Sequence, residues 1–346
     1  MDWKEIERIA REKFKGACRV CPRCNGRACA GEMPGIGGTG TGSSFMANFD
    51  ALAGVKLNMT TIHGASDPET AYEFFGLRLA MPILTAPLAG MKMNMGDPME
   101  EREFVAALVG GAADAGTLAF TADGPVPLFF GLGIEFLEKS GGRGVPTVKP
   151  RQEETFLEMV RRARDCGAPA VATDIDAAGI VHMRRAGQPA GPWPAETWKK
   201  TITRAGLPVI LKGVMTAREA EAAVRAGAAG IVVSNHGGRV LDHTPGTADV
   251  LPEIAAAVKG RIRILADGGI RCGADVLKML ALGAEAVLVG RPMAVAAVGG
   301  GREGVAFLLT RYAEQLRTAM MYTGCGSLAE ISPSAIRHIQ RGFLSS

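Results

Sequence analysis

The stretch ILADGGIRCGADVLKMLALGAEAVLVGRP, residues 264–292, decides the fold class. It includes most of an apolar, β-rich run (262–266), then a helical run (272–282) that ends at Gly283, and then a second short apolar run (286–289). A strand, a helix and a strand in this order form the repeat from which parallel sheets are built. The stretch therefore predicts an α/β protein with parallel strands.

The same alternation continues toward the N-terminus as far as about residue 78. One helical run, 216–226, has Thr216 and Glu219 at the spacing of a capping box, and Gly227 follows its end. We predict eight strands, over residues 82–86, 117–120, 146–149, 170–174, 209–212, 230–234, 262–266 and 286–289. Eight βα units predict a TIM (β/α)8 barrel, with the Gly- and Pro-rich segment 184–195 as a long loop over its mouth.

The N-terminal part differs in composition, so we divide the chain into an extension (1–55) and a barrel (56–346). The extension contains a glycine-rich stretch, 31–44, which predicts a flexible or ligand-shaped loop. It also contains the pattern C-x2-C-x2-C-x4-C, formed by Cys18, Cys21, Cys24 and Cys29. Thiolates at this spacing can bind zinc or an iron-sulfur cluster, and the alternative is metal-free or disulfide-forming cysteines.

Composition excludes several classes of protein. The chain has 346 residues, 47% hydrophobic, and its net charge of +4 comes without a long basic run, which argues against disorder and against a nucleic-acid partner. The uncharged apolar segment 293–301 is much shorter than the roughly 18 residues that span a bilayer. Residues 1–15 alternate charged and apolar side chains, unlike a signal peptide. We expect a soluble, cytoplasmic protein with no membrane partner and with reduced thiols.

Polar residues cluster at the ends of four consecutive predicted strands, where barrels carry their active sites. These residues are Lys212, the run Ser234-Asn235-His236-Gly237-Gly238-Arg239, the run Asp267-Gly268-Gly269-Ile270-Arg271, and Gly290-Arg291. Glycines allow backbone N–H groups to approach phosphate oxygens, and guanidinium groups add bidentate charge, so the last two runs predict a phosphate site. A lysine at the end of a core strand needs an anionic partner.

These motifs resemble those of the FMN-dependent α-hydroxy-acid-oxidising flavoproteins, such as glycolate oxidase and lactate oxidase. The resemblance covers LPVILKGV (207–214), VVSNHGGRVLD (232–242), ILADGGIRCGADVLKMLALGA (264–284) and VLVGRP (287–292), and more weakly MPILTAPLAG (81–90). It implies that Gly268, Gly269, Arg271, Gly290 and Arg291 bind the FMN phosphate and that Lys212 lies against the flavin ring. It further implies flavin contacts from Ala86, Pro87, Thr121, Ser234 and Asp267.

Oxidation of a 2-hydroxy acid requires a clamp for the carboxylate, a base for a proton and an electron acceptor. Arg239 can supply the clamp through two parallel hydrogen bonds. His236, in the same predicted loop, can supply the base, and Asp267 on the neighbouring strand end is expected to hold its imidazole in one tautomer. Of the other histidines, only His182 follows a predicted strand end closely.

The first half of the barrel departs from the family pattern. This chain has Ala-Pro-Leu (86–88) where the family has Ala-Pro-Thr, and Val-Lys-Pro (148–150) where the family has Gln-x-Tyr. It has Asp-Ile-Asp (174–176) where the family has Thr-x-Asp. The substrate tyrosines have no counterpart, and Arg184 and Arg185 are the nearby candidates for a second substrate arginine. These changes alter the pocket around the substrate and leave the histidine, the arginine and the flavin residues in place.

The leading interpretation is FMN-dependent oxidation of an L-2-hydroxy acid, lactate- or glycolate-like, with oxygen or another acceptor taking the electrons. Two alternatives stay open. One is a flavin-dependent isomerase similar to type 2 isopentenyl diphosphate isomerase, and the other is a non-catalytic redox protein in which flavin and a metal at the cysteines relay electrons. Members of the resembled family are commonly tetramers, so we expect a homo-oligomer.

Overall fold

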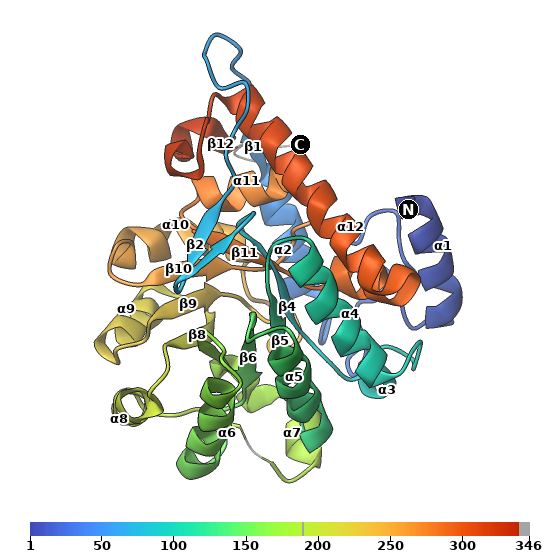
Figure 1. Cartoon of the computed structure of the whole chain (residues 1–346), viewed down its shortest axis with the longest axis vertical. Coiled ribbons are helices and arrows are strands. Elements are labelled where there is room, and N and C mark those ends of the chain that lie inside the picture. Colours follow the sequence, from blue (N-terminus) through green and yellow to red (C-terminus); the bar gives the residue numbers. More distant parts are fainter. Residues whose placement is uncertain (189, 339–346) are drawn as a thin grey trace, which may run out of the picture.

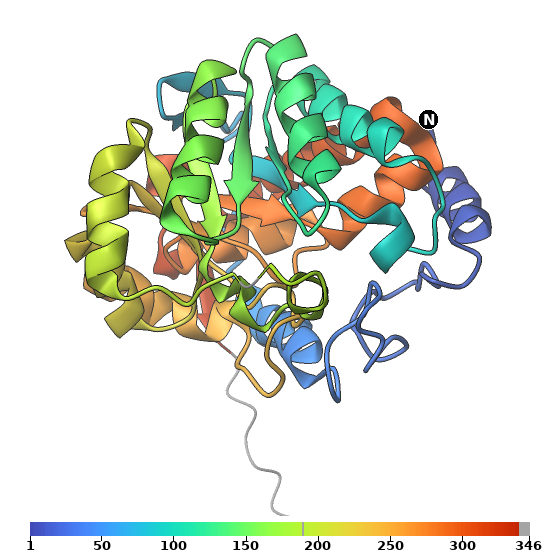
Figure 2. The same ribbon diagram turned by 90° about the horizontal axis from the view of Figure 1, so that it is seen from below.

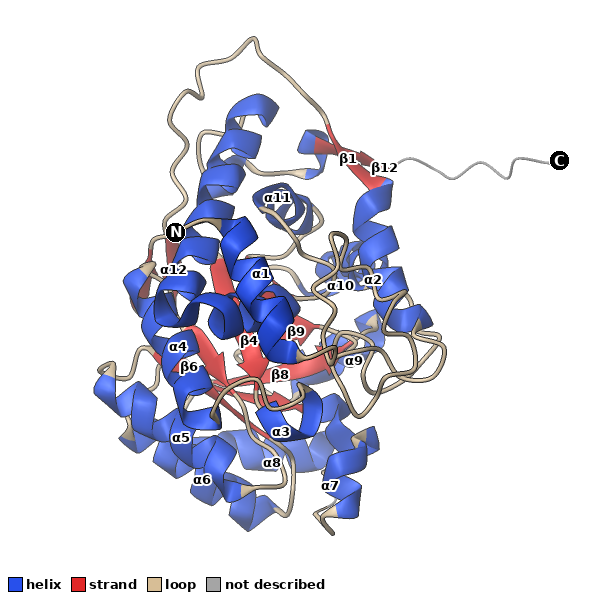
Figure 3. Cartoon of the chain, turned by 90° about the vertical axis from the view of Figure 1, so that its right-hand side faces the viewer, coloured by secondary structure: helices blue, strands red, loops and turns tan. Residues whose placement is uncertain are grey.

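The computed structural model describes residues 1–188 and 190–338 and contains a closed barrel of eight parallel strands (Figures 1 and 3). The strand order around the barrel is β10-β11-β4-β5-β6-β7-β8-β9, so neighbours in sequence are neighbours in space. The predicted TIM barrel is therefore confirmed. The barrel strands are β4 (Ile83–Leu88), β5 (Ala119–Thr121), β6 (Gly144–Val148), β7 (Val171–Asp174), β8 (Val209–Val214), β9 (Gly230–Val233), β10 (Arg263–Ala266) and β11 (Ala286–Val289).

Helices surround the barrel in the order that βα repeats require (Figure 1). The helix predicted over 216–226 is α9, and the Thr216 hydroxyl accepts a hydrogen bond from the Glu219 amide at 3.2 Å, which satisfies one free N–H of the first turn. The helices are α1 (Trp3–Phe14), α2 (Ser43–Gly54), α3 (Met91–Asn94), α4 (Glu101–Asp114), α5 (Pro127–Lys139), α6 (Glu153–Asp165), α7 (Val181–Arg185), α8 (Ala195–Ala205), α9 (Ala217–Arg225), α10 (Thr247–Val258), α11 (Gly273–Ala281) and α12 (Arg291–Thr323), with short 3₁₀ turns at Ile175–Gly179, Leu328–Glu330 and Pro333–Ala335.

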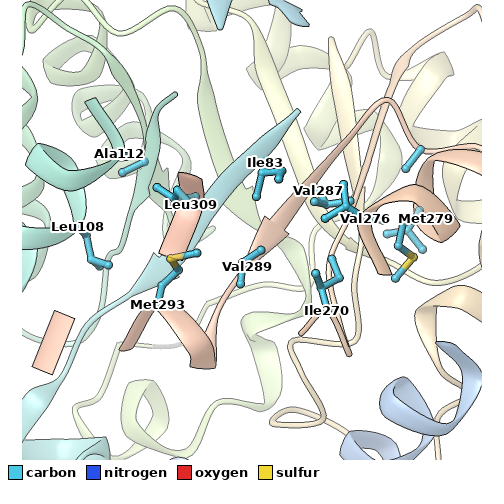
Figure 4. Close-up of a cluster of buried hydrophobic side chains, with 14 of the residues drawn as sticks. Ile83, Leu108, Ala112, Ile270, Val276, Met279, Val287, Val289, Met293 and Leu309 are labelled. Atoms are coloured by element: carbon cyan, nitrogen blue, oxygen red, sulfur yellow. The ribbon is translucent and has the colours of Figure 1, made fainter. Parts of the chain in front are cut away.

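The core has two layers because side chains alternate along each strand. Outward-facing residues pack against the helices, and Figure 4 shows Val289 near Met293 of α12 and Val287 near Val276 and Met279 of α11. Inward-facing residues fill the barrel with a separate cluster: Leu84, Ala86, Leu118, Phe120, Val145, Ala170, Ala172, Ile210, Val232, Leu265, Ala286 and Leu288. The barrel interior is therefore a packed core, and space for a ligand is left at its mouth.

A hairpin that we did not predict closes the amino-terminal end of the barrel. It consists of β2 (Tyr72–Phe74) and β3 (Leu77–Leu79), which pair antiparallel. Phe74 is buried within the inner cluster, with its ring centroid 6.4 Å from that of Phe120. A further antiparallel pair joins β1 (Val55–Leu57) to β12 (Ile336–His338). The carboxyl ends of the strands are thus the open end.

The N-terminal segment crosses this open end. Helix α1 packs against α12, and the loop between α1 and α2 runs along the side of the barrel where the strands end (Figure 2). The segment predicted as a loop over 184–195 begins with the last residues of α7 and continues without regular structure to α8, and residue 189 lies outside the described residues.

Helix α12 extends well beyond the predicted apolar run 293–301. By length and composition it could cross a membrane, but half of its most apolar window is buried in this molecule. It packs against α1, α4 and α11, and its axis is interrupted at Gly301, where φ is 58°. Its apolar surface therefore packs in the core of this fold. The helix begins directly after β11.

Candidate active site

A cavity of about 180 Å³ opens at the carboxyl ends of the barrel strands. The N-terminal segment contributes Met33, Ile36, Phe45 and Asn48 to its wall. Most of the residues predicted from the sequence line this cavity together: Ala86, Pro87, Lys212, His236, Arg239, Asp267, Gly268, Gly269, Arg271, Gly290 and Arg291. Residues from five strand ends, those of β4, β8, β9, β10 and β11, therefore converge on one site, as barrel geometry requires.

Thr121 does not face the cavity, so its predicted flavin contact is wrong. Phe120 belongs to the inner cluster, and side chains alternate along a strand, so Thr121 faces the helices. Its hydroxyl lies against Gly133 of α5, where an added Cβ would come within 2.6 Å of it. Ala122, Asp123 and Gly124 line the mouth after β5 instead.

Three charged side chains meet at the inner surface of the mouth. Lys149 Nζ lies 2.8 Å from Asp174 Oδ2, and Lys212 Nζ lies 3.1 Å from Asp174 Oδ1. Burial by itself would raise the pKa of Asp174, but the two ammonium groups hold that pKa well below its usual range. Burial likewise opposes the charge of Lys212, and the facing carboxylates raise its pKa above its ordinary value. Both lysines therefore share one buried carboxylate.

The stability of this buried arrangement should depend on pH. The pKa of Asp174 is lowered on folding, so its carboxylate stabilises the fold above its unfolded pKa of about 3.9, and that contribution is lost as pH falls through the folded pKa. We expect Lys149→Met to lower the free energy of unfolding by about 3 kcal/mol, because it breaks a buried pair. Asp174 would then be less strongly stabilised, so acid unfolding should begin at a higher pH, as followed by circular dichroism.

Lys139→Met is the matched control for this prediction. Lys139 Nζ lies 2.7 Å from Glu135, but the lysine side chain is 61% exposed. An exposed pair contributes less than about 1 kcal/mol, so this variant should unfold almost as the parent does. Equal effects of the two substitutions would contradict the importance of the buried pair.

His236 is held by a carboxylate, but Asp267 is not the residue in contact with it. Its Nδ1 lies 3.1 Å from Asp176 Oδ1 and 3.2 Å from Oδ2, whereas Asp174 Oδ1 is 4.0 Å away. The backbone of His236 is left-handed, with φ of 57°, and its amide donates to Ser234 Oγ at 3.0 Å. This turn directs the imidazole toward the segment after β7, which carries Asp176. The predicted partner, Asp267, is therefore corrected to Asp176.

Asp267 has a different environment. Burial raises its pKa, and Lys212, whose Nζ lies 3.9 Å from Oδ2, opposes this shift together with a hydrogen bond from Ser234. Its Oδ1 is buried and has no hydrogen-bond partner among the described residues, although Asp267 lines the cavity. An unsatisfied buried oxygen at a cavity wall fits a polar ligand at this position. Ser234 is fully buried, and its hydroxyl accepts the hydrogen bond from the His236 amide, so its connection to the site runs through His236.

Arg239 lies in the mouth and contacts two parts of the chain that sequence reasoning did not connect to it. Its Nη2 donates to Asn94 Oδ1 at 2.9 Å, and its Nη1 donates to the Gly35 carbonyl oxygen of the N-terminal loop. His182 Nε2 lies 3.1 Å from the same Asn94 oxygen and also lines the cavity. Burial and the nearby Arg239 lower the pKa of His182, so a neutral imidazole is favoured there.

The residues predicted to bind phosphate follow β10 and β11 and line the same cavity. Gly290 precedes the first turn of this helix, whose free N–H groups and positive dipole favour an anion. Gly269, with φ of 81°, lies so close to the Asn48 carbonyl oxygen that a Cβ would collide with it. Arg291 donates to the carbonyl oxygens of Ile36 and Gly37 at 2.8 and 3.0 Å.

These features fit FMN. The first residues of α12 and the arginines line the cavity, and so do Lys212 and Asp267 with its unsatisfied oxygen. This is the combination needed for a phosphate and for a polar ring system that gains negative charge. Arg271 has fewer N–H groups left for a phosphate, because its guanidinium donates to the Cys24 carbonyl oxygen at 2.8 Å.

The four N-terminal cysteines lie apart from this chemistry. They line a second cavity, between α1, α12 and the loop, and all four are free thiols. The two cavities share part of their walls, namely Ile36, Phe45, Arg271 and Arg291.

The chain belongs to the family of FMN-dependent dehydrogenases, which it matches over residues 36–202 and 181–338. Among its relatives, the 4-hydroxymandelate oxidase of Amycolatopsis orientalis is 36% identical, with 87% of this chain and 94% of the relative covered. The L-lactate dehydrogenase of Xanthomonas campestris pv. campestris is 34% identical, over 88% and 92%. A crystal structure of mandelate oxidase with benzoyl-formic acid superposes with a TM-score of 0.79 at 33% identity, over 96% of this chain and 97% of the other.

Membership of this family confirms the resemblance inferred from the motifs and defines the coarse activity. The chain is an FMN-dependent enzyme that oxidises an α-hydroxy acid. Asn94, Lys149, Asp174 and Asp176 are among the residues of the site to which the sequence interpretation gave no role. Asp176 was visible in the Asp-Ile-Asp run, and Asn94 carries no local signal because it lies on the short helix α3.

Proposed function

We propose that the enzyme oxidises an L-2-hydroxy acid to the 2-oxo acid, with His236 as the base and Arg239 as the clamp for the substrate carboxylate. The observation that carries this proposal is the shared cavity. His236 and Arg239 come from one loop after β9 and line the same space as Lys212 and Asp267. A base, a carboxylate clamp and a buried cation then surround one small volume, which is the set that this reaction requires.

The Asp176 contact assigns roles to the two imidazole nitrogens. Because Nδ1 donates to Asp176, Nε2 carries a lone pair and is the nitrogen left to take a proton from the substrate. The Asp176 carboxylate then stabilises the imidazolium that forms. His236 is the catalytic residue in this scheme, and Asp176 is a positioning residue.

Arg239 has donors left for a substrate. A guanidinium carries five N–H donors, and the described contacts of Arg239 use one from each terminal nitrogen. Burial, reinforced by Arg291, lowers its pKa to about 9, so the group is a cation at neutral pH. A carboxylate beside it would gain a charge-assisted hydrogen bond in a site largely free of water.

FMN, when bound, supplies the acceptor for the two electrons that leave the substrate. Lys212 and Asp267 are the residues that would contact its ring, and Gly268, Gly269, Gly290 and Arg291 would hold its phosphate. Lys212 would stabilise negative charge that develops beside it.

The apolar part of the wall favours substrates with a sizeable apolar side chain. Met33, Met93, Met183 and Phe129 line the cavity that also holds His236. Methionines adapt their shape to an apolar ligand, and each buried methylene of substrate adds about 1–3 kcal/mol of discrimination. We therefore expect kcat/KM for L-mandelate to exceed that for glycolate by at least ~10-fold.

The test is a panel of 2-hydroxy acids mixed anaerobically with the flavin-loaded enzyme. Loss of the visible flavin absorbance should be fast with L-mandelate, slower with L-lactate and slowest with glycolate. Isopentenyl diphosphate serves as the control substrate, because the isomerase alternative would use it. Absence of bleaching by every hydroxy acid would contradict the proposed reaction, and faster bleaching by glycolate would contradict only the side-chain preference.

A further inference from the structure

Four thiols from one short loop face a single cavity. Cys18, Cys21, Cys24 and Cys29 lie between α1 and α2 and line a space of about 250 Å³. This space adjoins the proposed oxidation site, with which it shares Ile36, Phe45, Arg271 and Arg291, and nothing in the proposed reaction uses the thiols. We propose that the four cysteines bind a [4Fe-4S] cluster, each Sγ losing its proton and binding one iron.

The sulfurs do not form the tight set that a single tetrahedral zinc ion requires. Tetrahedral zinc, with Zn–S bonds of about 2.3 Å, brings its thiolates within roughly 3.8 Å of each other. Among residues 1–188 and 190–338, no three of these cysteines place their sulfur atoms within 4.8 Å of one another. A cubane binds each thiolate to a different iron and so holds the sulfurs farther apart, at roughly 6 Å. One water-sized particle needs only ~15 Å³, so the cavity has room for a group larger than a single ion.

The order of the cysteines agrees with this assignment. Three of them follow C-x2-C-x2-C, the spacing with which a short loop wraps an iron-sulfur cluster in bacterial ferredoxins. The fourth ligand, Cys29, follows after four residues and lies on the same cavity. One continuous loop therefore supplies all four ligands, and no second segment has to be brought in.

The charge around the cavity suits an anionic cluster. Four thiolates in a partly buried site would repel one another without compensation. The cavity wall contains five arginines: Arg19, Arg23, Arg271, Arg291 and Arg311. Two polar groups also point at ligand sulfurs, with the Val20 amide 3.4 Å from Cys18 Sγ and Arg271 Nη2 3.4 Å from Cys24 Sγ. Hydrogen bonds to cluster sulfurs of this kind tune the reduction potential.

The loop is already fixed in place by contacts outside the thiols. Arg271 donates to the Cys24 carbonyl oxygen at 3.1 and 2.8 Å, and Arg11 of α1 donates to the Val20 carbonyl oxygen at 3.0 Å. Arg19 forms a bidentate pair with Glu32. A preorganised ligand loop lowers the entropy cost of binding the cluster.

The same loop continues into the wall of the oxidation site. Its carbonyl groups at Gly35, Ile36 and Gly37 hold Arg239 and Arg291. Removal of the cluster should therefore loosen this part of the mouth and weaken FMN binding without changing any residue of the oxidation site.

The experiment measures metal and sulfide in the full-length protein purified without oxygen. We expect about four iron atoms and about four acid-labile sulfides per chain, together with an electron paramagnetic resonance signal after reduction by dithionite. If the purified protein contains little iron, it is incubated anaerobically with equal amounts of ferrous and ferric ion and with sulfide before the measurement, so that no further oxidant is needed. One zinc per chain, or failure to take up iron and sulfide, would overturn the proposal.

Cys21→Ser tests the ligands directly, and Cys166→Ser is its matched control. Cys166 is buried at the end of α6, far from the loop, and its Sγ already donates to the Ala163 carbonyl oxygen, a contact that serine can keep. Cys21→Ser should lose most of the iron and bind FMN at least ~10-fold more weakly, whereas the control keeps both. Full iron content in Cys21→Ser would also overturn the assignment. Flavin bleaching by hydroxy acids is measured separately, so a failure of the proposed oxidation can be distinguished from a failure of the cluster assignment.

Discussion

Replacement of His236 by glutamine is expected to abolish reduction of the flavin by a 2-hydroxy acid, with a fall of about 10⁴-fold in the rate. Glutamine fills much of the imidazole volume and can still contact Asp176, but it has no nitrogen that accepts a proton at neutral pH. The flavin residues Lys212 and Gly290 are unchanged in this variant, so FMN should stay bound. The measurement is anaerobic stopped-flow of flavin absorbance with saturating substrate.

His243→Gln provides the control on the same stretch of chain. Its side chain is 75% exposed and lies 3.8 Å from Asp242, away from the cavity wall. The same change of side chain should leave the reduction rate within about twofold, because surface substitutions of this kind have small effects. Bleaching by His236→Gln at a rate near that of the parent would refute the assignment of the base.

The barrel could be predicted because its signals are local. Each buried strand is a short apolar run bounded by glycine or a polar residue, and α9 and α11 are bounded by residues that start and stop helices. Regular alternation of such units has few three-dimensional solutions, and right-handed crossovers reduce them further. The hairpin of β2 and β3 escaped prediction because three-residue strands give almost no periodic signal.

Side-chain direction was harder to infer than strand position. Thr121 ends a correctly predicted strand, yet it faces α5, because Phe120 occupies the inward position. All three residues of this strand are buried, so no exposed residue marks its outer face, and the sequence alone did not show which side chains point into the barrel. The anionic partner of Lys212 was predictable because a lysine inside an apolar run must face either a partner or solvent, and its Nζ lies 3.1 Å from Asp174 Oδ1. Its contact with the flavin stays a prediction.

The partner of His236 depended on a backbone conformation. Asp267 and Asp176 both follow strands, and β10 is the direct neighbour of β9 whereas β7 is one strand farther away. Sequence order therefore favoured Asp267. The left-handed backbone at His236 turns its ring toward Asp176 instead, and few non-glycine residues adopt that conformation. Such conformations in a site are associated with function.

The second large effect is expected when the carboxylate that contacts His236 is replaced. Asp176→Asn should slow flavin reduction by roughly 10³-fold while FMN stays bound, by the reasoning that applies to a carboxylate behind a catalytic histidine. The amide can donate to Nδ1, and this would leave the proton of the neutral ring on Nε2, where it blocks the base. Asparagine is also neutral, so the variant lacks the negative charge that stabilises the imidazolium.

Asp267→Asn distinguishes the two carboxylates. Asp267 is within 3.9 Å of Lys212 and has an unsatisfied oxygen at the cavity wall, so its loss should first weaken FMN binding. Asp176→Asn should instead keep FMN affinity and lower the rate of flavin reduction, because the imidazolium that forms during the reaction loses its counter-charge. A merely structural role for Asp176 would lower FMN affinity and the rate together. If Asp267→Asn lowered the rate with FMN fully bound and Asp176→Asn left the rate unchanged, Asp267 would be the carboxylate that supports His236, and the contact at 3.1 Å would not be the catalytic one.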